Sequence, residues 1–291
     1  MNETLSRWLQ LREPADIASR SESLSRTIAA TMPRAKPVHV LDLATGTGTN
    51  LRYLSGFLPD CQHWLIVDSN AELLNKVSVL TSSWASAQNF KFKKNIDRYL
   101  ISGTTLKCHI ETLNLDLRKL DNVEIFKDRD LVTASALLDL TSEQWLHTLA
   151  DRCRSVGAGV LFAITYTGGS TCSPQEPEDD MIRNLLNQHQ KTDKGLGGPA
   201  EGPDAVNCAS RCFKNVGYSV QTAPSHWMLG NNEHDLQRML IDSWTVAAIQ
   251  MEPAKVSLIS HWRFRRIQHI NAGRSRIVVS HLDLAAWLPR K

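Results

Sequence analysis

The feature that most restricts the fold of this chain is the segment VHVLDLATGTGTNLRYL, residues 38–54. It begins with the apolar run of a buried strand, passes through Gly46 and Gly48, and ends with apolar residues at helical spacing. A strand that enters a helix through a glycine turn commonly binds a nucleotide-like molecule at the ends of parallel strands. The segment therefore predicts an α/β fold with a binding site at this turn.

Strand-like and helix-like segments alternate over about 130 residues, as in sheets built from strand–helix–strand units. Strands are predicted at 38–44, 63–68, 107–117, from 130 onward and at 157–167, and helices at 49–58, 70–86 and 142–153, with Ser142 as an N-cap. This alternation predicts a mostly parallel sheet with helices on both faces.

The two ends of the chain add helices to this core. Residues 3–32 have the pattern of one or two helices interrupted near Pro14, and a Gly- and Pro-rich stretch follows Gly168. Beyond it we expect a helix at 205–216, a strand at 218–223, helices at 234–250 and 255–270, and a final strand within 275–288. With no linker between independent units, we expect one domain: a helical cap (1–32), a core (36–223), a helical insertion (224–274) and the final strand region (275–288).

The turn lacks the marks of two common phosphate-binding loops. A dinucleotide-binding turn has a third glycine where this chain has leucine at position 51, and a Walker A loop ends in lysine and serine or threonine, which are absent here. The local sequence DLATGTGTN instead resembles the first motif of class I S-adenosylmethionine-dependent methyltransferases, D-x-G-x-G-x-G. Asp42, Gly46 and Gly48 match it, and Ala44 replaces the first glycine.

Three further segments follow in the order of that family. Asp68 ends the next strand, 22 residues beyond Gly46, Asp116 follows the third strand, and DLVTASALLDL (130–140) resembles the segment that passes beneath the cofactor. The resemblance implies S-adenosyl-L-methionine as cofactor, with Asp42 attracting its ammonium, Asp68 holding its ribose, Asp116 near its adenine and an N-terminal arginine at its carboxylate. The cofactor-binding residues it implies are Asp42, Ala44, Thr45, Gly46, Gly48, Asp68, Ser69, Asp116, Leu117, Ser135 and Arg20, and Arg12 is a second candidate for the carboxylate.

The family resemblance also implies a Rossmann-like fold with a seven-stranded sheet, to which the sequence of this chain adds N-terminal helices and a helical insertion before the last strand. LREPADIASRS, HQKTDKGLGGPAEGP and VSHLDLAAW resemble a bacterial group of undefined substrate. We expect methyl transfer to an O or N atom of a small molecule, since the N/D-P-P-Y/F motif of nucleobase methylation is replaced by ASAL at 134–137. A protein or RNA methyltransferase and a catalytically silent binding protein stay open as alternatives.

Polar residues near the expected strand ends are the candidates for the acceptor pocket. Asp139 and His189 are the catalytic candidates, the latter because imidazole titrates near neutral pH. Asp193 and Lys194 lie in the Gly-rich region near His189. The aromatic wall is expected from Tyr166, Trp227 or Trp262.

Composition argues against several partners. The net charge of +3 is too small to indicate nucleic-acid or anionic-membrane binding, and no apolar run reaches the roughly 20 residues of a membrane span. The polar N-terminus is unlike a secretory signal, so we expect a cytoplasmic protein. Six scattered cysteines lack zinc spacing, so no metal is expected. The segment SHWRFRRIQH (260–269) has the composition of an RNA-binding patch, but it equally fits a helix with Ile259, Trp262 and Arg266 on one face.

Overall fold

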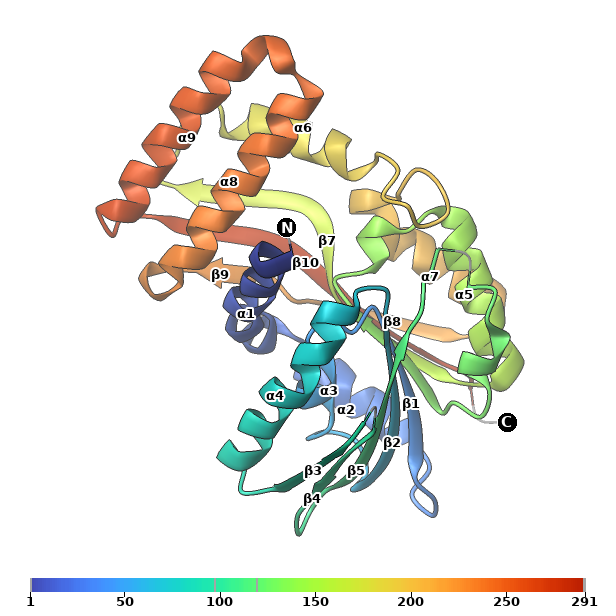
Figure 1. Ribbon diagram of the computed structural model, residues 1–291. Coiled ribbons are helices and arrows are strands. Elements are labelled where there is room, and N and C mark those ends of the chain that lie inside the picture. Colours follow the sequence, from blue (N-terminus) through green and yellow to red (C-terminus); the bar gives the residue numbers. More distant parts are fainter. Residues whose placement is uncertain (1, 97, 119, 290–291) are drawn as a thin grey trace.

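A single mixed sheet organises the molecule in the computed structural model, which describes residues 2–96, 98–118 and 120–289 (Figure 1). Its strands are β1 (Val38–Leu43), β2 (Cys61–Asp68), β3 (Lys91–Asn95), β4 (Arg98–Ser102), β5 (Lys107–Asn114), β6 (Leu131–Ser135), β7 (Gly159–Ser173), β8 (Ser219–Pro224), β9 (Trp227–Leu229) and β10 (Arg276–Trp287). The helices are α1 (Asn2–Ser19), α2 (Glu22–Thr31), α3 (Thr49–Leu54), α4 (Ala71–Ala87), α5 (Glu143–Val156), α6 (Asp179–Gln190), α7 (Ala205–Asn215), α8 (His234–Met251) and α9 (Val256–Asn271).

The strand order is β3-β4-β5-β2-β1-β6-β7-β10-β8, with β9 paired to β10. Strands β5, β2, β1, β6 and β7 are parallel, and β10 lies antiparallel between β7 and β8. Without β9 and the β3–β4 hairpin, seven strands remain, mostly parallel. The chain therefore has the predicted Rossmann-like α/β architecture, and the prediction that the final strand returns to the sheet is confirmed.

Helices cover both faces of the sheet, as the alternation predicted. Side chains of α2, α3 and α4 pack on one face, and those of α5 and α7 pack on the other. Ser142 caps α5 by accepting a hydrogen bond from the Trp145 amide, as expected. The long strands β7 and β10 extend past the ends of the other parallel strands. Their extensions form a third apolar cluster with α6, α8 and α9, and α1 packs on this cluster (Figure 1).

Two expectations need correction. The sheet has ten strands rather than seven, because residues 91–102 form an edge hairpin and 227–229 add a short strand. The N-terminal helices are separated at Arg20 and Ser21, whereas Pro14 lies inside α1. A proline removes a single amide donor, and the buried contacts of α1 keep the helix continuous.

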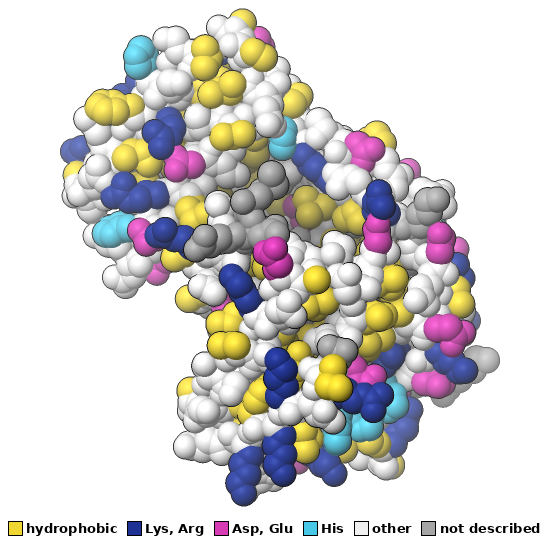
Figure 2. Space-filling model, in the orientation of Figure 1, with side chains coloured by type: hydrophobic (Ala, Val, Ile, Leu, Met, Phe, Trp, Pro, Cys, Tyr) yellow, Lys and Arg dark blue, Asp and Glu magenta, His cyan; other side chains and the backbone are white. Residues whose placement is uncertain are grey.

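Part of the sheet has one face on which few other residues pack. Between β5 and β6 the described residues form only the short 3₁₀-helix η1 (Val123–Phe126), where a parallel connection usually contains a full helix. The first halves of β1, β2 and β5 therefore show one face to solvent, next to the β3–β4 hairpin. Figure 2 shows Lys, Arg and His side chains gathered at the lower end of the molecule, over these strands. No described helix combines the length and apolar character that a membrane crossing needs.

Candidate active site

The turn after β1 brings the backbone close to its neighbours. Gly46 and Gly48 have φ values of +59° and +83°, a region that glycine occupies without steric penalty. A Cβ atom on Gly46 would lie 3.1 Å from Leu9 Cδ1, and one on Gly48 would lie 3.2 Å from Arg52 Nη1. Ala44 also has a positive φ, of +51°, which suits the glycine of the family motif better than alanine.

Asp42 holds this turn in place. It is fully buried and accepts hydrogen bonds from Thr45 Oγ1 at 2.5 Å and from Asn50 Nδ2 at 2.6 Å. Asn50 also donates to Thr133 Oγ1 at 3.0 Å, which joins the turn to β6. Burial raises the pKa of Asp42 to about 6, although both hydrogen bonds favour its ionised form. The hydrogen bonds of the Asp42 carboxylate thus stabilise the conformation of the turn.

Asp68 joins the end of β2 to the same turn. One carboxylate oxygen accepts from the Gly46 amide at 2.8 Å and the other from the Asn70 amide at 2.8 Å. Burial raises the pKa of Asp68, and the backbone hydrogen bonds oppose that shift. Each oxygen retains a lone pair, so the carboxylate can accept two further hydrogen bonds from a ligand.

Arg20 is a buried cation with unused donors. Its Nη1 donates to Asn50 Oδ1 at 2.6 Å, and its guanidinium lies 4.1 Å from the ring centroid of Tyr53. Within the described part of the chain, its Nε and Nη2 have no hydrogen-bond partner. Buried polar groups are rarely left unpaired, so these two donors point to an anionic ligand. Arginine donors in this fork geometry match a carboxylate.

A cavity of about 50 Å³ lies beside the turn. Leu9, Arg12 and Asp16 of α1 form one wall, Asp42, residues 44–47, 49 and 50 form another, and Ser135 at the end of β6 closes it. Helix α1 is fastened over the turn by Glu13, whose Oε1 accepts from Arg52 Nη2 at 2.7 Å. Because ligand pockets usually measure about 300–1,000 Å³, a nucleoside-sized ligand requires α1 to move.

A second group of side chains lies next to this cavity and is called the strand-end cluster: Asp139, Tyr166, Trp227 and His281. Trp227 and His281 have ring centroids 4.9 Å apart, and those of Tyr166 and His281 lie 6.2 Å apart. Arg12 connects the cluster to the cavity, because it lines the cavity and lies 5.0 Å from the Trp227 ring centroid. The Trp227 indole also donates to Asp16 at 2.9 Å.

Two groups of the strand-end cluster combine burial with a free polar atom. Asp139 Oδ1 and His281 Nδ1 have no hydrogen-bond partner among the described residues. Burial raises the pKa of Asp139 to about 6, whereas backbone hydrogen bonds and the charge of Arg12 oppose the rise. Burial lowers the pKa of His281 to about 3, with Arg12 and His226 adding to the effect. His281 is therefore neutral near pH 7, and Asp139 is mostly ionised.

His189, the other catalytic candidate, lies at the end of α6 and outside the strand-end cluster. Its Nε2 is 2.9 Å from Gln250 Oε1, and Lys194 Nζ is 3.3 Å from its Nδ1. Burial and the charge of Lys194 lower the pKa of His189. The charge of Lys194 also opposes the rise of the Asp139 pKa. Asp193 is exposed and accepts from the Gly195 amide at 2.7 Å.

The residues predicted near ribose and adenine are spread over the surface and the core. Asp116 is exposed and accepts from the Arg118 amide at 2.9 Å, and the Arg118 hydrogen bonds lower its pKa. Leu117 is buried, and its carbonyl accepts from the Trp145 indole at 2.7 Å. Ser69 is exposed beside Asp68. The segment still begins next to Asp68, because the Leu115 amide donates to the Asp68 carbonyl at 3.1 Å.

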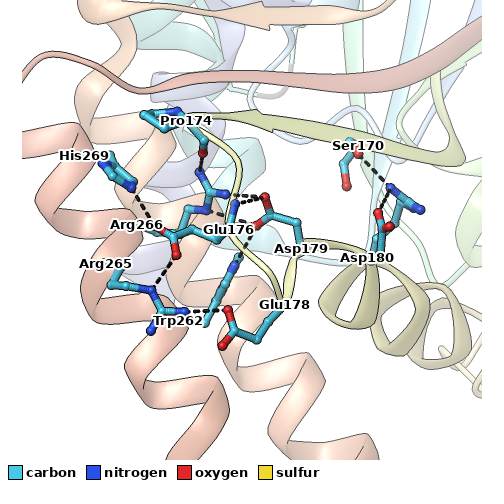
Figure 3. Close-up of polar contacts among 11 residues, drawn as sticks. Ser170, Pro174, Glu176, Glu178, Asp179, Asp180, Trp262, Arg265, Arg266 and His269 are labelled. Atoms are coloured by element: carbon cyan, nitrogen blue, oxygen red, sulfur yellow. Dashed lines mark hydrogen bonds and ion pairs between the residues drawn. The ribbon is translucent and has the colours of Figure 1, made fainter.

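The basic segment 260–269 forms part of α9 and faces acidic groups (Figure 3). Arg266 is fully buried, and its guanidinium pairs with Asp179, which also accepts from the Trp262 indole at 2.8 Å. Arg265 pairs with Glu176 and Glu178, and Arg263 pairs with Asp242. The helix interpretation, with Ile259, Trp262 and Arg266 on its buried face, is confirmed. Trp262 thus fastens α9 to the start of α6.

Four side chains of the site were not singled out from the sequence: Asp16, Asn50, His281 and Asp283. Asn50 ends the DLATGTGTN run, and His281 and Asp283 lie in VSHLDLAAW, so both stretches were noted as motifs. Their roles depend on contacts between elements that are distant in sequence. Asp283, for example, accepts from the amides of Ser21 and Ile164, each at 2.8 Å.

Comparisons with known proteins reach only the level of the fold. No protein-family model matches the chain, and no curated protein sequence matches it. Among solved structures, a cyclopropane synthase from Mycobacterium tuberculosis has 10% identity and a TM-score of 0.45, covering 90% of this chain and 82% of that chain. A SAM-dependent methyltransferase from Geobacter sulfurreducens, in complex with S-adenosyl-L-homocysteine, has 12% identity and a TM-score of 0.42, covering 93% and 92%. A precorrin-6y C5,15-methyltransferase from Geobacter metallireducens has 9% identity and a TM-score of 0.43, covering 92% and 86%. Similarities this distant do not identify an activity.

Proposed function

We propose that this protein is an S-adenosyl-L-methionine-dependent methyltransferase that methylates an O or N atom of a small molecule. The observation that carries the proposal is the convergence of three groups at the ends of β1 and β2. These are a glycine turn at close approach, the buried carboxylate of Asp68, and the free donors of buried Arg20, which reaches the turn through its hydrogen bond to Asn50. Together they match a ligand with a ribose and an amino-acid carboxylate but no phosphate.

The residues present fit this cofactor group by group. Arg20 Nε and Nη2 would hold the carboxylate of its amino-acid part, because two parallel N–H donors form a bidentate pair with a carboxylate. Asp68 would accept hydrogen bonds from ribose hydroxyl groups. Gly46 would let the chain between these parts pass close to the backbone. When bound, the cofactor supplies a methyl group on a sulfonium, an electrophilic carbon open to in-line attack by a nucleophile.

The strand-end cluster supplies the groups that an acceptor needs. Tyr166 and Trp227 provide aromatic contact, and Asp139 and His281 each present a free acceptor atom. A neutral imidazole or an ionised carboxylate can take a proton from a hydroxyl or ammonium group as it becomes a nucleophile. The cover of α1 over the turn would exclude water and favours a small acceptor over a macromolecule.

Calorimetric titration with S-adenosylhomocysteine tests the cofactor site. We expect Asp68→Asn and Arg20→Met each to weaken binding by about tenfold or more, since a hydrogen bond to a charged group contributes about 1.5–3 kcal/mol. Exposed Asp60→Asn and Arg26→Met are matched controls and should bind like the unmodified protein. Absence of binding by the unmodified protein, or equal affinities throughout, would show that this turn is not the cofactor site.

A cocrystal structure with S-adenosylhomocysteine then tests the acceptor side. We expect Asp139 and His281 to border the space next to the cofactor sulfur. A broad, positively charged groove leading to the sulfur would instead favour a protein or RNA acceptor.

A further inference from the structure

A row of side chains crosses five neighbouring strands on the thinly covered face described above, which we call the open sheet face. In register, Lys93 of β3 lies opposite Leu100 of β4, and Leu100 lies opposite His109 of β5. The row continues through His63 of β2 to His39 of β1. Ring centroids are 4.9 Å apart for His109 and His63 and 5.0 Å apart for His63 and His39. The three imidazoles therefore form a continuous ladder, and Leu100 of β4 lies between its His109 end and Lys93 of β3.

The charge on this face is strongly one-sided. Lys91, Arg98 and Lys107 lie on the same side of β3, β4 and β5 as Lys93, and all four are exposed. Glu111 is the one acidic residue that these five strands place on the face within the described residues, and it pairs with Arg98 at 3.1 Å. Four cations against one carboxylate leave an excess of three, which equals the net charge of +3 on the whole chain.

The imidazoles can add to this charge. Burial and the neighbouring imidazole lower the pKa of His63 and His109, with the charge of Lys107 in the same direction and Glu111 opposing it. At the end of the row, the Asp130 carboxylate accepts from the His39 amide at 2.9 Å and pairs with Lys36 at 3.0 Å. The three imidazoles become positively charged when they are protonated, and a bound polyanion would favour their protonation. The face itself contains little negative charge.

We propose that the open sheet face binds single-stranded RNA. The lysines and Arg98 would contact phosphates, and the imidazoles and Leu100 between them would contact base faces, the combination by which sheet surfaces hold single strands. Neutral imidazole nitrogens, Asn95 and Ser102 lie on the same face and can accept hydrogen bonds from 2′-hydroxyl groups. Five strands about 4.8 Å apart span about 20 Å, enough for several nucleotides.

This surface is separate from the basic segment of α9, whose arginines are paired with acids (Figure 3). It is also remote from the proposed active site. His39 and His63 lie near the first residues of β1 and β2, whereas the glycine turn and Asp68 lie at the opposite ends of the same strands. RNA binding here therefore does not depend on the proposed methyltransferase activity, and either can fail alone.

Fluorescence anisotropy with a fluorescein-labelled oligouridylate of about 20 nucleotides tests the proposal at low salt. We expect the double variant Lys93→Glu/Lys107→Glu to bind at least about tenfold more weakly, and its salt slope to fall by about 1.4, about 0.7 per lost phosphate contact. The control Lys214→Glu/Lys255→Glu changes the chain charge equally at exposed sites elsewhere and should keep its affinity. Thermal unfolding checks that both variants fold.

Two further arms separate RNA from other polyanions and test the histidine ladder. Because the pKa values of His63 and His109 are lowered, binding should strengthen as the pH falls from about 7 to about 5, and His63→Ala/His109→Ala should lose most of this change. Polyglutamate or a DNA strand of the same sequence should compete more weakly than unlabelled RNA. Equal competition by polyglutamate would overturn the proposal in favour of an acidic protein partner, and equal competition by DNA would remove the 2′-hydroxyl argument. Equal weakening in both charge-reversal variants would show that binding follows net charge rather than this face.

Discussion

The buried carboxylate of Asp139 should lower the stability of the protein at neutral and alkaline pH. Burial raises its pKa from an ordinary 3.8 to about 6. Because the folded-state pKa is raised, folding is favoured while the group is protonated, and that stability is lost as the pH rises through the folded pKa. A shift of about two units at about 1.4 kcal/mol per unit gives a penalty of about 3 kcal/mol above pH 7.

Asp139→Asn removes this penalty at nearly constant shape. One amide atom can keep the backbone hydrogen bonds, and the other replaces Oδ1, which already lacks a partner in the described chain. We expect the variant to be more stable by up to about 3 kcal/mol at about pH 8, but by only about 1.5 kcal/mol at about pH 5, where the native carboxyl is already mostly protonated. Turnover should fall if Asp139 takes part in the reaction, while cofactor affinity is retained.

Urea unfolding followed by tryptophan fluorescence measures the difference, with the exposed carboxylate variant Asp60→Asn as control. The control should change stability by less than about 0.5 kcal/mol at either pH. A gain for Asp139→Asn that is equal at both pH values, or a loss at about pH 8, would refute the argument that desolvation of a charge dominates at this position.

Two further predictions concern the elements that close the site. Glu13→Gln weakens the contact of α1 with Arg52, so S-adenosylhomocysteine should associate a few-fold faster, as expected for the loss of about 1 kcal/mol. Stopped-flow fluorescence measures the association rate. An unchanged rate would mean that α1 does not limit entry. Gly197→Ala places a Cβ 2.6 Å from Ser142 Oγ at a φ of +90°, and Ser142 follows the segment that carries Asp139. Turnover should therefore fall by at least about tenfold with S-adenosylhomocysteine affinity within about twofold, whereas the neighbour Gly198→Ala, with no atom within 4 Å of its Cβ, should keep more activity.

The sequence predicts the core of the fold because its segments carry strong local patterns. The apolar run before Gly46, the acid at the end of β2 and the capping serine at position 142 each determine structure within a few residues. The β3–β4 hairpin was missed because KFKKN is mostly charged and forms an exposed edge strand, where apolar alternation is weak.

The candidate site was only partly predictable, because its decisive properties arise from contacts across the chain. Arg20 was expected near the cofactor, but its free donors follow from burial against Asn50 and Tyr53. His281 is distinguished by the desolvation of its ring between Trp227 and Tyr166, which no local pattern shows. The glycine turn is a local motif, whereas the strand-end cluster and Arg12 are brought together from α1, β7, β9, β10 and the segment that carries Asp139.

The positive charge of Arg20 is compensated by the carboxylate of Asp283. Asp283 is buried and is the largest favourable charge acting on Arg20. Its two oxygens accept hydrogen bonds from the Ser21 and Ile164 amides, so Asp283 compensates the charge of Arg20 through space while these hydrogen bonds go to backbone amides. Asp283→Asn removes that charge and turns one acceptor into a donor facing an amide. We expect unfolding to become easier by about 3–5 kcal/mol, the usual effect of leaving a buried charge without its partner. The remaining folded protein should bind S-adenosylhomocysteine at least as tightly as before, since Arg20 would then lack a competing carboxylate. Calorimetry on protein shown to be folded by circular dichroism measures this. A loss of affinity as large as that of Arg20→Met would contradict this argument. It would mean that Asp283 is needed to position the guanidinium and does more than compensate its charge.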